Sequence, residues 1–327
     1  MRLFLAGTER IEADVKAINK MNASGGRSMK LYLAGGENQL QSAVKEVKKD
    51  MQVFLAEGDG VAAGYLDKLN QENEKMNLYL AESGGCLKQY LSEADLYKDA
   101  FILQSFFYVS DFTEEIIIPN CKDFLLDSGA FTFIQKAKNN VDWSEYTKRY
   151  AAFINKNKIK KFFELDIDSI VGYEKVIELR KQLEDLTGSQ PIPVWHQNRG
   201  AEEFIRMCEE YPYVAIGGLV GGGGNSSEYS QKYWGLFPWF INNAHKHGAK
   251  IHALGFTSMK GLHQYKFDSV DSSSWVSGNR FGMIYYFDGK TIKQISKPPG
   301  KRVKTNQAAI HNFNEWKKFS KYAERNL

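Results

Sequence analysis

The sequence predicts an α/β protein in which parallel strands alternate with helices. Two observations carry this prediction: short apolar runs recur after Met76, and amphipathic segments separate several of them. Eight such units are the requirement for a closed (β/α)₈ TIM-type barrel, and an open doubly wound sheet is the alternative. The eight runs are 78–81, 101–109, 124–126, 162–165, 192–195, 214–216, 251–254 and 267–270.

The helical segments are recognised by the spacing of their apolar residues. Trp143, Tyr146, Tyr150 and Phe153 recur at steps of three and four, which places them on one helix face. The same spacing occurs within 176–183 and 204–211, and Gly188 and Gly248 are suitable helix stops. We expect the aromatic face of the first helix to be buried, and base stacking is the less favoured alternative.

A repeated strand-like pattern marks the N-terminal part of the chain. MRLFLAG, MKLYLAG, MQVFLAE and MNLYLAE begin at Met1, Met29, Met51 and Met76. Each copy predicts a strand, a turn and a short helix, as 39–51 illustrates. We therefore expect a βα-like repeat extension at 1–75, in which nothing is chemically distinctive, followed by the barrel at 76–282.

The C-terminal segment, 283–327, reads as a basic hairpin followed by a helix. Runs at 283–286 and 291–295 flank Asp288-Gly289, and 306–325 has helical character. The chain carries a formal charge of +4, yet 290–327 alone holds ten Lys or Arg against Glu315 and Glu324. Such a cluster can neutralise the phosphates of a polyanion, and a solvated surface tail is the alternative.

Composition excludes several classes of protein. Hydrophobic residues make up 43% and charged residues 25%, which is typical of a globular chain with a large core. The three cysteines are far apart and form neither a disulfide framework nor a zinc clip. No apolar stretch approaches the roughly 18 residues of a membrane span, and the N-terminus lacks the apolar core of a signal peptide. We expect a cytoplasmic protein without a membrane partner.

Carboxylates follow three of the predicted strands. Asp127 ends one run, Asp166 and Asp168 follow another, and Asp271 comes directly after the last. In a barrel, the catalytic groups come from these carboxyl ends, although a single aspartate there often only caps the next helix. Like charges that converge in a cleft raise one another's pKa, so that one carboxyl stays protonated as an acid while another remains an ionised nucleophile.

Two further strand ends carry candidate ligand contacts. His196 and Gln197 follow one strand, and the glycine-rich stretch 217–224 follows the next. Gly217 and Gly218 can bring backbone N–H groups close to a ligand, whereas 221–224 is better suited to a lid or a linker. The stretch lacks the lysine of a P-loop. His245, His247 and His252 lack a further ligand at metal spacing, so we expect neither a metal nor a cofactor.

The ordered motifs together resemble those of the tRNA-guanine transglycosylases. The segments that carry the resemblance are LDSGAF at 126–131, Asp166/Asp168, AIGGL at 215–219, LGFT at 254–257 and FDSVDS at 267–272. Compact phage-encoded members that act on DNA are the most similar. The resemblance implies a barrel enzyme that replaces guanine in DNA or tRNA by a free 7-deazaguanine base, as in queuosine-type modification, in the host cytoplasm if a phage encodes it.

The resemblance also implies residue roles. Asp271 corresponds to the nucleophile that attacks C1′ of the sugar, and Asp127 to the general acid/base. Asp166 corresponds to the acceptor for the donor edge of guanine, whereas Gly217 and Gly218 correspond to donors for its carbonyl. The remaining expected contacts to the base are Asp168, His196, Gln197 and Ser128, and the expected contacts to nucleic acid are Arg280, Lys297, Lys301, Arg302 and Lys304.

Two departures from the family pattern limit what the resemblance implies. The zinc motif of three cysteines and a histidine is missing, and Ser-Gly-Ala at 128–130 replaces Ser-Gly-Gly. Two other hypotheses therefore stay open: a barrel lyase or hydrolase for a small phosphorylated substrate, and a non-catalytic nucleic-acid-binding protein. The choice between DNA and tRNA and the presence of a homodimer also stay open.

Overall fold

The chain folds into two compact units in a computed structural model, Met1–Lys75 and Met76–Leu327. The division falls where the fourth copy of the N-terminal repeat begins. The structure describes residues 2–6, 30–34, 52–55, 75–82, 85–129, 132, 141–218, 234–276, 282–295 and 304–327.

The first unit contains a three-stranded parallel sheet. Its strands are β1 (Arg2–Ala6), β2 (Lys30–Ala34) and β3 (Gln52–Leu55), in that order. Equivalent positions of the repeat pair directly, for example Phe4 with Tyr32 and Tyr32 with Phe54. The repeated pattern thus forms one strand per copy, as expected, while the helices expected between the strands lie outside the described residues.

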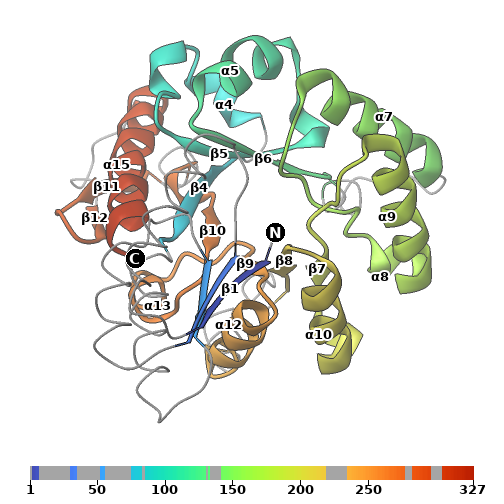
Figure 1. The fold of residues 1–327 in the computed structure, drawn as a ribbon. Coiled ribbons are helices and arrows are strands. Elements are labelled where there is room, and N and C mark those ends of the chain that lie inside the picture. The colour runs from blue at the N-terminus through green and yellow to red at the C-terminus, as the bar shows by residue number, and fades with distance from the viewer. Residues whose placement is uncertain are drawn as a thin grey trace. The chain divides into compact units, whose positions relative to one another are not determined.

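The second unit is built on a curled sheet of seven parallel strands (Figure 1). The sheet order is β6-β5-β4-β10-β9-β8-β7, so that the last strand of the sheet in sequence lies beside the first. The predicted α/β architecture with a parallel sheet is therefore confirmed. The strands are β4 (Asn77–Ala81), β5 (Phe101–Ser105), β6 (Asp123–Asp127), β7 (Val194–Trp195), β8 (Tyr213–Ile216), β9 (Lys250–Ala253) and β10 (Ser269–Ser272).

The predicted strand at 162–165 appears as two isolated bridges between the edge strands. Leu126 of β6 bridges Phe162, and Phe163 bridges Ile192, which lies just before β7; both bridges are parallel. The backbone N–H of Phe163 donates to the Leu126 carbonyl at 2.9 Å, and that of Ile192 donates to the Phe162 carbonyl at 2.8 Å. This segment therefore connects the two edges of the seven-stranded sheet.

The run predicted as a strand over 101–109 ends earlier than expected. β5 stops at Ser105, and Phe106–Tyr108 turn into a short 3₁₀ helix. The Ser105 hydroxyl accepts a hydrogen bond from the Phe107 N–H and so caps that turn. The chain therefore leaves the sheet after Ser105. On the neighbouring strand β6, the residue paired with Ser105 is Asp127.

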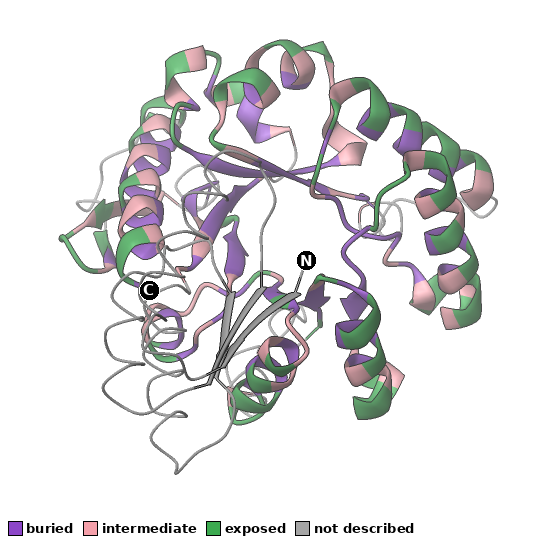
Figure 2. Cartoon of the chain, in the orientation of Figure 1, coloured by how far each residue is buried: buried purple, intermediate pink, exposed green. Residues whose placement is uncertain are grey.

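Helices cover the convex side of the sheet, and their buried sides face the strands (Figure 2). Longer helices are amphipathic, as their apolar spacing predicts. The helices are α4 (Cys86–Tyr90), η1 (Ala94–Leu96), η2 (Phe106–Tyr108), η3 (Thr113–Ile117), α5 (Ile118–Asn120), α7 (Trp143–Asn157), α8 (Asp168–Val171), α9 (Tyr173–Thr187), η4 (Gln197–Arg199), α10 (Gly200–Glu210), α12 (Phe237–Lys246), α13 (Met259–Gln264), η5 (Ser274–Val276) and α15 (Thr305–Asn326).

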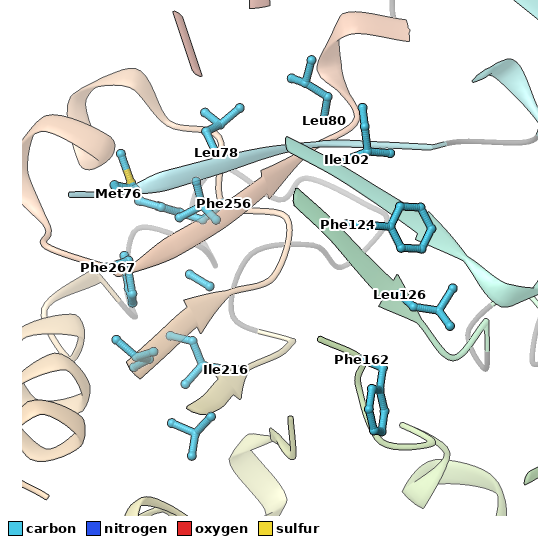
Figure 3. Packing of buried hydrophobic residues seen from close by; sticks show 14 of the residues in the cluster. Met76, Leu78, Leu80, Ile102, Phe124, Leu126, Phe162, Ile216, Phe256 and Phe267 are labelled. Carbon is cyan, nitrogen blue, oxygen red and sulfur yellow. The ribbon is translucent and has the colours of Figure 1, made fainter. Parts of the chain in front are cut away.

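Alternation along each strand divides the core into two layers. Leu78, Leu80 and Phe124 belong to the layer that packs against the helices (Figure 3). Tyr79 and Leu125 belong to a second cluster that consists of residues from the sheet and its connecting segments, with no helical residue. This second cluster lies on the concave side of the sheet, opposite the helices, and packs against the strands there.

The aromatic face of α7 packs against both β6 and the bridging segment, residues 162–165. Tyr146 and Tyr150 are buried and belong to the predicted helix face, so neither is available to stack bases, whereas Trp143 is only partly buried. The Tyr150 hydroxyl lies 3.1 Å from the carbonyl oxygens of both Leu126 and Phe163. Tyr150 thus contacts the backbones of both β6 and the bridging segment, which pair with each other only at the Leu126–Phe162 bridge.

Glu164 is a charged residue at the centre of the helix-facing layer. Its side chain is completely buried, and Oε2 accepts a hydrogen bond from Arg180 Nε of α9 at 2.6 Å. Oε1 accepts from Arg199 Nη1 at 2.9 Å and from the Val194 N–H at 2.8 Å. The carboxylate therefore ties the bridging segment to α9, to β7 and to the turn that follows β7.

The C-terminal hairpin and helix form as predicted. β11 (Ile284–Phe287) and β12 (Ile292–Ile295) pair antiparallel, and α15 packs on β4 within the Met76–Leu327 unit. The Ser320 hydroxyl donates to the Leu78 carbonyl at 2.7 Å, and Phe319 is fully buried. Within the part of the chain that the structure describes, no helix has the length and apolar character needed to cross a membrane.

Replacement of Glu164 by Gln should lower the free energy of unfolding by about 3–5 kcal/mol, because the buried guanidinium of Arg180 loses its anionic partner and that of Arg199 keeps only Asp168. Denaturant unfolding at pH 7 measures the change. Glu178→Gln is the matched control on α9, since Glu178 pairs with Lys175 at the exposed surface and should matter by less than about 0.5 kcal/mol. Equal effects of the two substitutions would contradict this role for Glu164.

Candidate active site

The carboxylates predicted to converge lie at one end of the curled sheet. Asp127 is the last residue of β6, Asp271 is the next-to-last residue of β10, and Asp166 follows the bridging segment. Because all the strands run in the same direction, these three residues share the rim formed by the carboxyl ends. His196 and Gly217 reach the same rim, directly after β7 and β8.

Asp271 is held in place by two donors. Its side chain is 12% exposed, so one part of it still faces the rim. Oδ1 accepts a hydrogen bond from the Gly255 N–H at 2.7 Å and lies 3.2 Å from Nε2 of His252, a completely buried residue of β9. Both contacts involve the same carboxylate oxygen, Oδ1.

Asp127 is a carboxyl group at the rim whose pKa is shifted. Burial raises the pKa of Asp127 to about 6; the charges of Asp166 and Asp271 act in the same direction, whereas the Gly129 N–H opposes them. That N–H donates to Asp127 Oδ2 at 3.0 Å. Gly129 has a φ of 77°, and a Cβ there would lie 2.9 Å from the Phe107 nitrogen, so only glycine fits.

The coupling among these carboxylates has a chemical consequence. The charges of Asp166 and Asp271 help to keep the proton on Asp127, because ionisation of Asp127 would add a further negative charge beside them. Asp127, with a pKa of about 6, is suited both to donate and to accept a proton.

Asp166 and His196 form a close pair beside a pocket. His196 Nε2 lies 2.6 Å from Asp166 Oδ1. Burial alone lowers the pKa of His196, but the hydrogen bond and charge of Asp166 outweigh it, and the net shift is upward. The pocket has a volume of about 450 Å³, enough for a purine base, and its lining residues are His196, Gln197, Asn198, Gly217 and Gly218.

The two glycines after β8 have different environments. The Gly217 N–H donates to the Trp195 carbonyl at 2.8 Å, so it is used within the sheet and does not point to a ligand. A Cβ on Gly217 would lie 2.7 Å from His196 Cε1, so this glycine lets the imidazole approach. Gly218 has a φ of 71° and is exposed, which leaves it as the glycine able to present an N–H to a ligand. Residues 221–224 lie outside the described residues.

Asp168 belongs to a network of ion pairs that also contains Glu164, Arg180 and Arg199. It is the first residue of α8, and its Oδ2 accepts from Arg199 Nε at 3.2 Å and from Asn198 Nδ2 at 3.3 Å. Burial would raise the pKa of Asp168, but the Arg199 guanidinium outweighs it and holds that pKa below its usual range. Arg199 in turn stacks on the Tyr173 ring, 4.2 Å from its centroid.

This network of Glu164, Arg180 and Arg199 was not among the predicted site residues. One signal in the sequence pointed to it, because Glu164 interrupts the apolar run Phe162-Phe163-Glu164-Leu165. A charge inside a buried strand requires a partner. The sequence does not say which arginine provides it.

One group at the rim has the donor types and spacing of a metal site. Ligand atoms of Asp166, Asp168 and His196 all lie within 4.8 Å of one another. Arg199 already contacts Asp168, and His196 already contacts Asp166, so the negative charge is compensated by protein groups. A cation would have to displace these contacts. The donor set therefore fits a hydrogen-bonding site better than a metal centre.

Ser128 is buried in the protein rather than exposed at the rim. It is completely buried, and its carbonyl accepts a hydrogen bond from the Tyr146 hydroxyl at 2.5 Å. Gln197, in contrast, is exposed and lines the pocket. Contacts from either residue to a base stay predictions.

The predicted nucleic-acid contacts fall largely on undescribed parts of the chain. Lys304 is exposed immediately before α15, whereas Arg280, Lys297, Lys301 and Arg302 lie outside the described residues. Part of the basic charge on α15 is used internally: Lys317 donates to the Leu96 carbonyl at 2.8 Å, and Lys321 pairs with Asp99.

Asp127→Asn should stabilise the protein at pH 8 by about 1–3 kcal/mol, since a raised pKa means that the ionised carboxylate is disfavoured in the folded state. The contribution of Asp127 to the unfolding free energy falls as pH rises from about 4 through 6, because in that window this carboxyl binds its proton more tightly in the folded state than in the unfolded state. The advantage of Asn should therefore disappear at pH 4. Chemical denaturation at both pH values measures it, with exposed Asp185→Asn as control. An equal effect at pH 4 and pH 8 would exclude a raised pKa.

Comparison with models of known protein families gave no match to this chain, and a search of curated proteins gave none either.

Proposed function

We propose that this chain is a base-exchange glycosyltransferase that replaces guanine in a polynucleotide by a free 7-deazaguanine base. The observation that carries the proposal is the position of Asp127, Asp166 and Asp271. These carboxylates are far apart in sequence, lie on one rim of a parallel sheet, and two of them raise the pKa of the third. The motifs shared with the guanine transglycosylases support the same assignment.

We further propose that the sheet closes into an eight-stranded barrel. The two bridges through Phe162 and Phe163 support closure, because they link β6 to the segment that enters β7. The eighth strand would then be the bridging segment that contains Phe162 and Phe163. Closure places the pocket beside His196 and the Asp271 carboxylate on opposite walls of one mouth.

The first half of the proposed reaction transfers the sugar to the protein. Asp271 Oδ2 attacks C1′ and forms a glycosyl ester while the bond from C1′ to N9 of guanine breaks. Protonated Asp127 donates its proton to the departing base. Asp166 accepts hydrogen bonds from the amino and N1–H groups of guanine, and the Gly218 N–H donates to its carbonyl oxygen.

The second half reverses these steps with another base. The incoming 7-deazaguanine gives its N9 proton to ionised Asp127, and N9 attacks C1′ as the ester to Asp271 breaks. Two displacements restore the original configuration at the sugar. The target nucleotide must first leave the base stack to reach the rim.

Incubation of the protein with DNA or tRNA that carries labelled guanine, plus a free 7-deazaguanine base, should release label in a manner that depends on the added base. Asp271→Ala should reduce release by about 10³-fold or more, because it removes the nucleophile. Exposed Asp185→Ala is the matched control and should leave the rate unchanged. Absence of release from both polymers, or release that Asp271→Ala does not affect, would exclude the proposed reaction.

The same assay separates the other candidate activities. Turnover of a small phosphorylated compound, with indifference to polynucleotides, would favour a lyase or hydrolase. Binding of nucleic acid without turnover would favour a binding protein.

We also propose that the basic segment before α15 holds the polynucleotide. Combined Glu substitutions of Lys297, Lys301, Arg302 and Lys304 should weaken binding and reduce the salt dependence of log K by up to about 4, since each lost phosphate contact removes roughly 0.9 from the slope. The control for overall charge is the fourfold Glu variant of the exposed Lys148, Lys156, Lys175 and Lys181 on α7 and α9. These substitutions are preferable to truncation, because α15 packs on β4. An unchanged slope in the fourfold variant would place the polynucleotide elsewhere.

A further inference from the structure

A column of hydrogen bonds crosses the interior of the sheet and ends on Asp271. Tyr213 of β8 contacts the Ser269 hydroxyl of β10. Ser269 Oγ lies 2.5 Å from His252 Nδ1, and His252 Nε2 lies 3.2 Å from Asp271 Oδ1. His252 and Ser269 are completely or almost completely buried, at 0% and 1% exposure, so water does not provide alternative partners.

The chemistry of the four groups gives the column one direction. An ionised Asp271 accepts only, so His252 must present a proton on Nε2. A neutral imidazole with its proton on Nε2 has a lone pair on Nδ1, and the Ser269 hydroxyl then donates to it. Ser269 in turn accepts from the Tyr213 hydroxyl. Every donor and acceptor is satisfied in this order, whereas a proton on Nδ1 would place two lone pairs face to face at Asp271.

The surroundings of His252 favour the neutral ring. Its neighbours are the Phe163 ring, with centroids 5.3 Å apart, and the Tyr79 ring, with centroids 6.2 Å apart. Asp271 is its one anionic contact among the described residues, and that carboxylate also accepts from the Gly255 N–H. A charged imidazolium in this apolar layer would carry a desolvation cost that the neutral tautomer avoids.

We infer that His252 is a positioning residue for Asp271. It donates Nε2–H to Oδ1, its tautomer is set by Ser269 and Tyr213, and the carboxylate is fixed with Oδ2 turned to the rim. The inference rests on the proposed function, in which Oδ2 is the nucleophile. It adds a requirement that the carboxylate motif alone does not contain, namely a specific neutral tautomer of a buried histidine on the neighbouring strand.

Substitution of His252 should separate positioning from packing. His252→Leu keeps bulk but removes the donor, and we expect the base-exchange kcat to fall about 10²-fold with the KM for the free base within about twofold. His252→Gln retains a donor near the Nε2 position and should restore kcat to within about tenfold of the original. Ser269→Ala should lower kcat by about tenfold, because the tautomer is no longer fixed. Equal losses in the Leu and Gln variants would overturn the inference.

A spectroscopic measurement tests the column without relying on turnover. The chain has six histidines, and ¹⁵N-labelled His252 is assigned from the signal that His252→Gln removes. We expect the ¹⁵N shifts of a neutral ring protonated on Nε2. A ring protonated on Nδ1, or on both nitrogens, would overturn the inference.

The base-exchange assay and the ¹⁵N spectrum of His252 test the proposed reaction and the hydrogen-bond column separately. An inactive protein with His252 protonated on Nε2 would exclude the proposed reaction and retain the column. An active protein whose His252 has the other tautomer would retain the reaction and exclude the column. If His252→Leu does not fold, the spectrum of the unmodified protein and the kcat of Ser269→Ala decide the question.

Discussion

The common direction of the strands in one curled sheet is the constraint on which the rest of the structure depends. Side chains 144 residues apart, those of Asp127 and Asp271, influence one another because both strands end at the same rim. A single reversed strand would place its carboxylate at the opposite end. The rim also explains why Asp127 has a raised pKa: it lies in a partly buried position that two further carboxylates face.

Polar groups within the sheet are arranged to support that rim. On the helix side, Glu164 binds two arginines and the Val194 N–H, and so fixes the segment that carries Asp166 and the turn that carries His196. On the concave side, the column through His252 fixes Asp271. Buried charges of this kind cost free energy unless they are paired, and here their pairing fixes the geometry of the site.

The sequence predicted the elements with regular spacing and missed those whose definition depends on distant partners. The alternation of strands and helices, the C-terminal hairpin and the aromatic face of α7 follow from local periodicity. The limits of β5 do not, because Ser105 ends the strand by capping a turn. Carboxylates at strand ends were recognised from position alone, whereas the roles of Glu164 and Gly217 depend on Arg180, Arg199, Trp195 and His196, which only folding brings near.

The most direct measurement is a crystal structure of the protein with guanine bound. The base should occupy the pocket beside His196, with its N1–H and amino group on Asp166, its N9 edge toward Asp127, and Asp271 Oδ2 facing the position of C1′. Guanine bound away from this rim, or Asp271 turned from the base, would contradict the central claim that three distant carboxylates form one purine site.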